Sequence, residues 1–86
     1  MTFDKNKIVE ELKNNHSYTS FINKNCMVMI SKYSSIYAGI NDEYKLQIHK
    51  RITEGEEKGR FKNVLETKYV QDIEKIFVAL EIVDFD

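Results

Sequence analysis

The sequence predicts a small α+β domain in which a four-stranded antiparallel meander carries an N-terminal and a longer C-terminal helix on one face. The first observation is a C-terminal stripe of apolar residues spaced by three and four, with polar residues between them, which is typical of an amphipathic helix. The second is a middle region where apolar and polar residues alternate with the period of half-buried strands. The stripe consists of Val70, Ile73, Ile76, Phe77, Leu80 and Val83. Such a stripe needs an apolar surface to cover, so the helix should pack on the sheet.

The first helix is expected from about Lys5 to Asn14. Asp4 precedes it and can accept hydrogen bonds from its free backbone amides, while Phe3 and Ile8 can close a hydrophobic staple around Asp4. The next segment, 17–22, fits one helical turn as well as a short extended piece. We expect it to be irregular.

Two strands are predicted in the following stretch. The continuous apolar run 26–30 suits a central strand buried on both faces. Residues 32–35 would then reverse the chain. The alternation in 36–40 predicts a second strand, which ends at the turn formers Asn41 and Asp42.

Residues 44–52 have the clearest strand pattern in the chain. Its apolar members Tyr44, Leu46, Ile48 and Ile52 alternate with Lys45, Gln47, His49 and Arg51. A helix would also align Tyr44, Ile48 and Ile52 at a spacing of four, but it would leave Leu46 outside the stripe, so the strand is favoured. The segment 53–59 contains two glycines in a charged run and predicts a hairpin loop.

Residues 61–65 are expected to form the fourth strand, and the long helix should begin near Lys68. The connections are short throughout. Because parallel strands need crossovers of about a dozen residues or more, short connections imply antiparallel pairing. With 86 residues and no linker or repeat, the chain (1–86) is expected to form a single domain.

Composition excludes several classes of protein. Hydrophobic residues make up 42% of the chain and the formal net charge is −1, which is incompatible with the high-charge, low-hydropathy signature of disorder. The balance of charges gives no global attraction to nucleic acid or to anionic membranes, and a net charge near zero favours self-association. A nucleic-acid partner would therefore have to be recruited by a local patch.

The compartment is expected to be reducing and cytoplasmic. Cys26 is the sole cysteine, whereas small secreted domains usually carry several disulfides. The charged start of the chain lacks the apolar core of a signal peptide, and no run approaches the length of a membrane span. Proline and tryptophan are absent while lysine, isoleucine and asparagine are frequent, which is typical of AT-rich coding sequence in low-GC bacteria and their phages.

No motif predicts catalysis, a cofactor or a metal. His16 and His49 lack partners at metal-ligand spacing, and Cys26 opens the most apolar segment, where a thiol stays protonated. The run Gly55–Arg60 lacks the Gly-Lys-Ser/Thr ending of a phosphate loop and carries two glutamates that would repel phosphate. We expect a protein that is not an enzyme.

One candidate binding surface remains, on the solvent face of the sheet. Its expected members are Tyr37, Lys45, Gln47, His49, Arg51, Arg60 and Lys62. Cations beside an aromatic ring are typical of surfaces on which single-stranded RNA stacks. The ordinary interpretation is a solvated face whose lysines pair with nearby glutamates.

These observations favour a non-catalytic inhibitor or adaptor that binds another macromolecule, most simply a protein, as a phage or mobile-element product that blocks a host factor would. Its contact surface would be the uncovered sheet face or an exposed strand edge, and self-pairing at such an edge would give a homodimer. The alternatives are an RNA-binding module on the basic face and an accessory subunit of a larger assembly.

Overall fold

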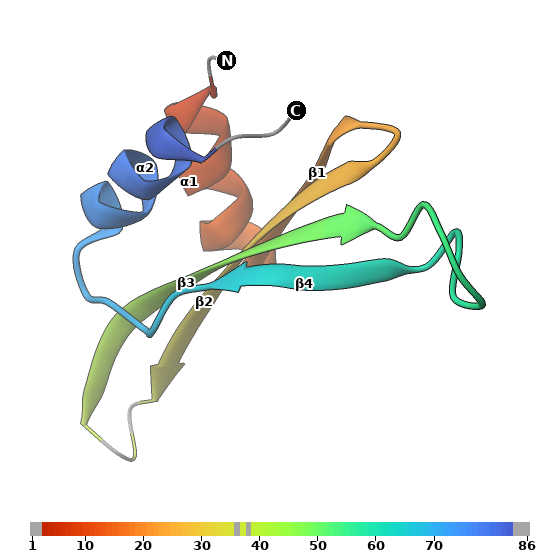
Figure 1. The fold of residues 1–86 in the computed structure, drawn as a ribbon. Coiled ribbons are helices and arrows are strands. Elements are labelled where there is room, and N and C mark those ends of the chain that lie inside the picture. The colour runs from red at the N-terminus through yellow and green to blue at the C-terminus, as the bar shows by residue number, and fades with distance from the viewer. Residues whose placement is uncertain (1–2, 36, 38, 84–86) are drawn as a thin grey trace.

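The computed structural model describes residues 3–35, 37 and 39–83, and it has the predicted order of one helix, four strands and one helix (Figure 1). The elements are α1 (Lys5–Asn15), β1 (Ser17–Asn23), β2 (Cys26–Ser35), β3 (Ile40–Arg51), β4 (Phe61–Glu66) and α2 (Ile73–Ile82). The strands lie side by side in the order β1-β2-β3-β4, and every neighbouring pair is antiparallel. The α+β class and the four-stranded meander are thus confirmed.

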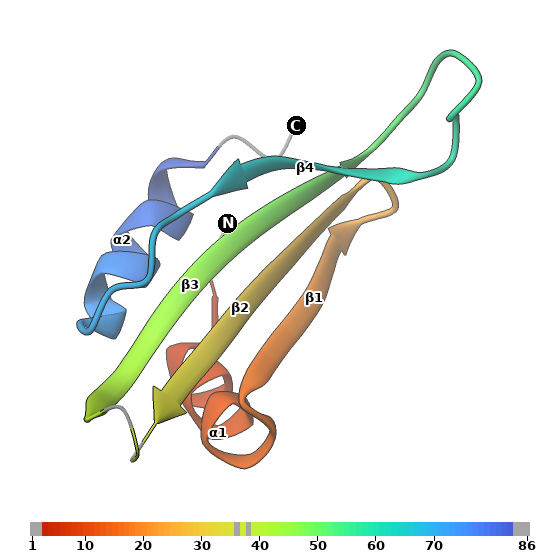
Figure 2. The same ribbon diagram turned by 90° about the horizontal axis from the view of Figure 1, so that it is seen from below.

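Both helices pack on one face of the sheet, as expected, and leave the other face open (Figure 2). The core between the helices and the sheet is formed by alternate residues of β2 and β3 and by the apolar stripes of the helices. Its members, each at most 4% exposed, are Ile8, Leu12, Cys26, Val28, Ile30, Leu46, Ile48, Ile76, Phe77 and Leu80. Burial of a side chain of this size contributes about 1.5–3 kcal/mol, so this layer supplies most of the stabilisation.

The helix ends follow from local side-chain chemistry. Asp4 caps α1 by accepting a hydrogen bond from the Lys7 amide at 3.1 Å, as the sequence predicts. Asp72 caps α2 in the same way, accepting from the Glu74 amide at 3.0 Å. The C-terminal helix therefore begins at Ile73 and not near Lys68, because Val70 is held in an extended bridge to Tyr44 by two backbone hydrogen bonds of 2.7 and 2.8 Å.

The prediction that residues 17–22 are irregular is wrong. They belong to β1, which pairs with β2 from Ser17 opposite Ser31 to Asn23 opposite Cys26. The alternate residues Tyr18, Ser20 and Ile22 are half-buried on the helix side, whereas the residues between them are exposed. An edge strand with only one partly buried face leaves a weak apolar pattern in the sequence.

The second strand also differs from the prediction. β2 continues through residues 32–35, so these residues do not reverse the chain, and β2 is buried on one face only, with Met27 and Met29 half-buried on the other. The strand expected over 36–40 is not formed: Tyr37 and Gly39 lie in the turn between β2 and β3, and Ile36 and Ala38 fall outside the described residues. Gly39 has a φ of +67°, a conformation that suits glycine in a tight turn.

The β3–β4 hairpin confirms the remaining strand predictions. Residues 44–52 are extended as far as Arg51, and the loop over 53–59 leads into β4. The register shifts between Ile48 and His49, a bulge that bends β4 relative to β3. Both this hairpin and the β1–β2 hairpin reach beyond the helices at one end of the sheet (Figure 1).

Candidate functional site

The candidate site is the sheet face opposite the helices, which we call the open face. Large apolar side chains gather there although no helix covers them. They are Phe21 of β1, Met27, Met29 and Tyr33 of β2, Phe61 of β4 and Tyr69 in the segment after β4. Phe21, Tyr33 and Tyr69 remain 62%, 46% and 44% exposed. An exposed apolar cluster of this kind is typical of a contact surface.

The predicted polar row on β3 lies on the open face. Lys45, Gln47, His49 and Arg51 alternate with the buried residues Leu46 and Ile48, so their side chains point away from the helices. All four are half-buried by their neighbours on this face. The structure therefore brings together these four members of the predicted site.

Lys45 is paired within the protein. Its Nζ lies 3.0 Å from a carboxylate oxygen of Glu66 on β4 and 5.0 Å from the centroid of the Tyr69 ring. The Tyr69 ring in turn lies 6.1 Å from that of Tyr33. The ammonium group thus joins an ion pair to an aromatic pair, and its charge is largely balanced.

Gln47 and His49 extend this network along β3. The Gln47 side-chain amide donates a hydrogen bond to Glu66, and Nε2 of His49 lies 3.2 Å from Oε1 of Gln47. The hydrogen bonds from Lys45 and Gln47, together with the charge of Lys45, hold the pKa of Glu66 below its usual value. The polar groups at the centre of the open face are therefore mutually satisfied.

Arg51 joins the two hairpins at the outer end of the sheet. Its Nε donates to the Lys24 carbonyl at 2.9 Å, its Nη1 donates to the Gly59 carbonyl at 2.8 Å, and the guanidinium lies 4.6 Å from the centroid of the Phe61 ring. The rings of Phe21 and Phe61 are 5.9 Å apart although β2 and β3 separate their strands. Because neighbouring strands lie about 4.8 Å apart, this approach requires a strongly curved sheet. The open face is concave at this end.

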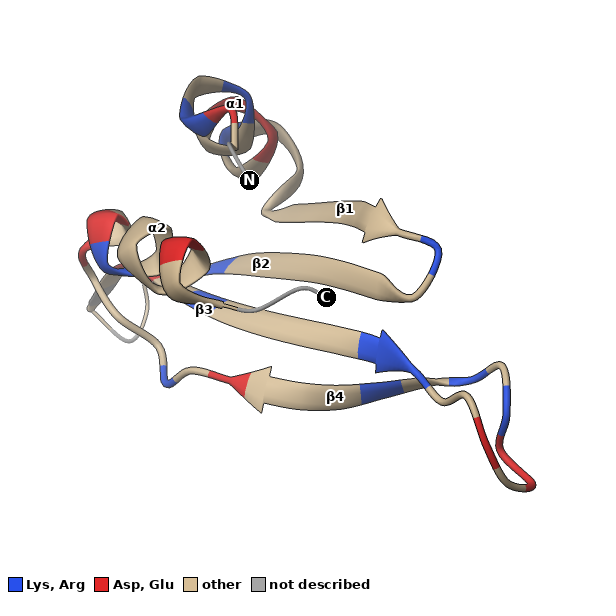
Figure 3. Cartoon of the chain, turned by 45° about the horizontal axis from the view of Figure 1, so that its top comes forward, with Lys and Arg blue, Asp and Glu red and all other residues tan. Residues whose placement is uncertain are grey.

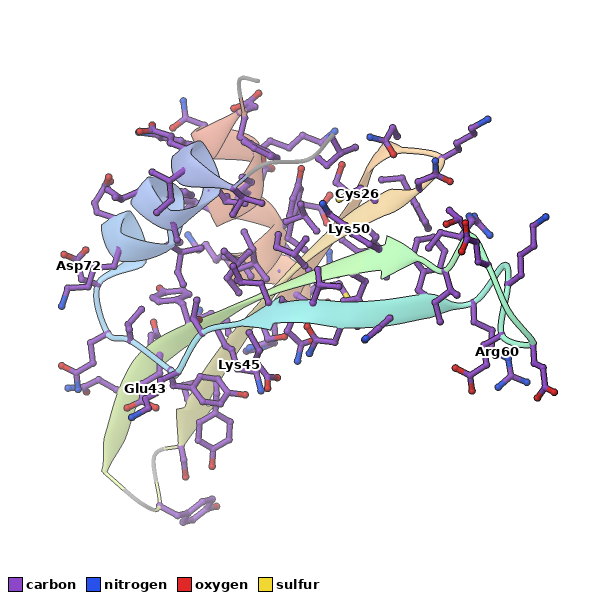
Figure 4. All side chains as sticks on the ribbon, viewed as in Figure 1. Cys26, Glu43, Lys45, Lys50, Arg60 and Asp72 are labelled. Carbon is purple, nitrogen blue, oxygen red and sulfur yellow. The ribbon has the colours of Figure 1, made fainter. Side chains whose placement is uncertain are left out.

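Three predicted members do not join this group. Tyr37 is fully exposed in the β2–β3 turn, and Lys62 pairs across from Lys50 on the helix side of the sheet. Arg60 precedes β4 in the loop, at the opposite end of the hairpin from Lys45 (Figure 4). The predicted basic patch is therefore smaller than expected, and the aromatic residue beside it is Tyr69 and not Tyr37.

Sequence reasoning missed the aromatic residues of the open face. The predicted irregular segment 17–22 left Phe21 out of the sheet, and the predicted turn over 32–35 left out Tyr33. The alternation of Tyr18 and Ile22 with Thr19 and Phe21 is the signal that could have identified β1. The proximity of Tyr69 to Lys45 depends on the Val70 bridge and had no signal in the sequence.

Other chemistry in the described part of the chain is sparse. Burial raises the pKa of the Cys26 thiol, with Lys50 opposing that shift. No three His, Cys, Asp or Glu side chains among the described residues gather around a common point where a metal ion could bind. Neither described helix combines the length and the hydropathy needed to cross a bilayer. No protein-family model, curated protein or solved structure matches this chain.

Proposed function

We propose that this protein is a non-catalytic binding protein, an inhibitor or adaptor, that docks another protein on its open face. The observation that carries the proposal is the set of exposed rings on the sheet face that the helices leave uncovered, with Phe21 toward one end of that face and Tyr33 and Tyr69 toward the other. Aromatic residues and methionine are enriched in the cores of protein interfaces, where a few of them provide most of the binding energy. Met27 and Met29 add adaptable apolar surface between the rings.

The state of the cations favours a protein partner over a nucleic acid. The charge of Lys45 is paired with that of Glu66, and two donor groups of Arg51 are taken by backbone carbonyls, which leaves fewer of its N–H groups for a phosphate. The formal net charge of −1 adds no attraction for phosphate. A surface that combines exposed aromatic side chains with mutually satisfied polar groups suits the surface of another protein.

A pull-down from a low-GC bacterial lysate tests the proposal, with the wild type compared with Tyr33→Asp. The matched control is Val78→Asp, which places the same charge on an exposed residue of α2; Tyr33 and Val78 are 46% and 58% exposed. We expect wild type and Val78→Asp to retain the same protein after nuclease treatment, and Tyr33→Asp to lose it. Equal retention by all three proteins would refute a role for the open face.

RNA binding is a second candidate, favoured by one observation: the ring of Tyr69 lies beside Lys45, and that of Phe61 beside Arg51, on an antiparallel sheet. Unpaired bases stack on such platforms. Fluorescence anisotropy with labelled single-stranded RNA tests it. RNA binding would weaken steeply between about 50 and 200 mM salt. Absence of binding at the lower salt concentration eliminates this candidate.

A further inference from the structure

The outer edge of β1 offers unpaired backbone groups. The Lys32 amide donates to the His16 carbonyl at 2.8 Å, so these two residues form a hydrogen-bonded pair. In an antiparallel ladder such pairs alternate with pairs that are not hydrogen-bonded, so every second residue of β1, counted from His16, is hydrogen-bonded to β2. The N–H and C=O groups of Ser17, Thr19 and Phe21 consequently point outward. Within the described residues, no hydrogen bond from another element reaches these groups.

β1 lacks two of the features that usually protect a sheet edge, charged residues and proline. Its sequence, SYTSFIN, contains no charged residue and no proline, and Figure 3 shows the strand free of the charges that mark the helices and the β3–β4 loop. The other edge strand, β4, carries Lys62 and Glu66 and a bulge opposite Ile48 and His49. β1 has an irregularity of its own between Phe21 and Asn23, near the end of the strand. Because charged residues protect natural edges, β4 is protected and β1 is open to pairing over the regular part of the strand.

We propose that β1 pairs antiparallel with β1 of a second copy of this chain, about a two-fold axis at Ser20. This register centres the pairing on the regular part of Ser17–Asn23 and leaves the irregularity between Phe21 and Asn23 near each end of the paired stretch. It sets Thr19 opposite Phe21 of the second copy, and the outward groups of these two residues exchange hydrogen bonds. It also sets Tyr18 opposite Ile22 of the second copy, on the helix side.

The strand is complementary to itself in this register. The Tyr18–Ile22 and Thr19–Phe21 pairs each combine an aromatic with a β-branched residue, a favourable cross-strand combination, and no like charges meet. Ser17, Thr19, Phe21 and Asn23 are all exposed. A net charge of −1 adds little repulsion between copies. The second copy is therefore the partner that the chemistry of β1 fits best.

The result is a continuous eight-stranded sheet, four strands from each copy. The two open faces become one surface, with Phe21 of each copy near its centre. This inference does not depend on the proposed docking of another protein, because it uses the strand edge and the proposed function uses the sheet face. Either can fail without the other.

Cysteine cross-linking tests the register. In Ser20→Cys, the two introduced thiols face each other across the axis in a non-hydrogen-bonded pair, whose Cα atoms lie about 4.5 Å apart, within the range for a disulfide. In the matched control Ser17→Cys, the two thiols are separated by six residues, about 20 Å. Cys26 is 1% exposed and stays reduced in both. We expect mild oxidation to give a covalent dimer of Ser20→Cys alone.

Thr19→Pro tests the edge itself. Proline removes an outward N–H in each copy and leaves the β1–β2 ladder intact. Analytical ultracentrifugation should show the wild type as a dimer, and Thr19→Pro should dissociate with a Kd raised about tenfold or more. Thr19→Val should remain dimeric, and circular dichroism verifies that each variant is folded.

Three results would overturn the proposal. A wild type that stays monomeric at millimolar concentration excludes the dimer. A folded Thr19→Pro that dimerises as the wild type does places the contact elsewhere. Cross-linking of Ser17→Cys as readily as Ser20→Cys excludes the register.

Discussion

The guanidinium of Arg51 stacks on the ring of Phe61 at 4.6 Å while the same side chain donates hydrogen bonds to carbonyls of both neighbouring loops. One residue at the end of β3 thereby connects the β1–β2 turn to the β3–β4 loop. No helix covers this end of the sheet (Figure 1). The geometry of the outer sheet accordingly depends on the planar, forked donor group of arginine.

Arg51→Lys should lower the free energy of unfolding by about 1–2 kcal/mol, because lysine keeps the charge but cannot reach both carbonyls and stack on the ring. Equilibrium urea unfolding measures the change. Arg60→Lys, the same replacement at an exposed loop residue, should stay within about 0.5 kcal/mol of the wild type. Equal effects of the two replacements would contradict the connecting role of Arg51.

Leu46→Ala should lower the free energy of unfolding by about 2–5 kcal/mol, because Leu46 is 0% exposed and its truncation leaves a cavity beneath the helices. Leu65→Ala, on the same side of the sheet but 38% exposed, should cost about 1 kcal/mol or less. Equilibrium urea unfolding measures the loss of stability in each variant. For a chain of this length, a loss at the upper end of the Leu46 range approaches the whole stability.

Asp72→Ala should lower stability by about 1 kcal/mol, because the free amide of Glu74 loses its acceptor at the start of α2. Asp72→Asn keeps a capping oxygen and should lie close to the wild type. Thermal unfolding followed by circular dichroism compares the three proteins. A loss as large for asparagine as for alanine would show that the charge, and not the cap, stabilises this helix end.

Glu66 should titrate below its usual pKa of 4.5, and Lys45→Met should raise its pKa toward that value, because the ammonium group is the main cause of the shift. The pKa is lower in the folded than in the unfolded state. Its contribution to stability is therefore present above pH 4.5 and is lost as the pH falls through the folded-state pKa. NMR titration of the Glu66 carboxyl in both proteins measures the shift. An unchanged pKa in Lys45→Met would refute this assignment.

The sequence was sufficient to predict the elements with strong periodicity. The alternation over 44–52 predicted β3 and the side of the sheet on which Lys45 and Arg51 lie, and the apolar stripe predicted α2. The strand count was correct because the unpredicted β1 compensates for the strand expected over 36–40. Local pattern determines such elements only where one face is well buried, as it is for Leu46 and Ile48.

The composition of the open face could not be predicted in the same way. Met27 and Met29 have apolar side chains on a face without a helix, so hydrophobicity alone wrongly predicted burial on both sides of β2. The contact between Phe21 and Phe61 joins residues forty positions apart and depends on the curvature of the sheet. Twist and bulges set that curvature, which cannot be deduced from the residue types of each strand taken separately.

The β3–β4 loop closes at its base, where the Ile52 amide donates to the Arg60 carbonyl at 2.7 Å and the Gly59 amide to the Ile52 carbonyl at 2.8 Å. Beyond this closure, residues 54–58 are exposed and belong to no helix or strand. A fluorophore or an affinity tag inserted there would leave the core, the open face and the β1 edge untouched. The loop is thus a natural attachment point for a reporter in every binding and association assay described above.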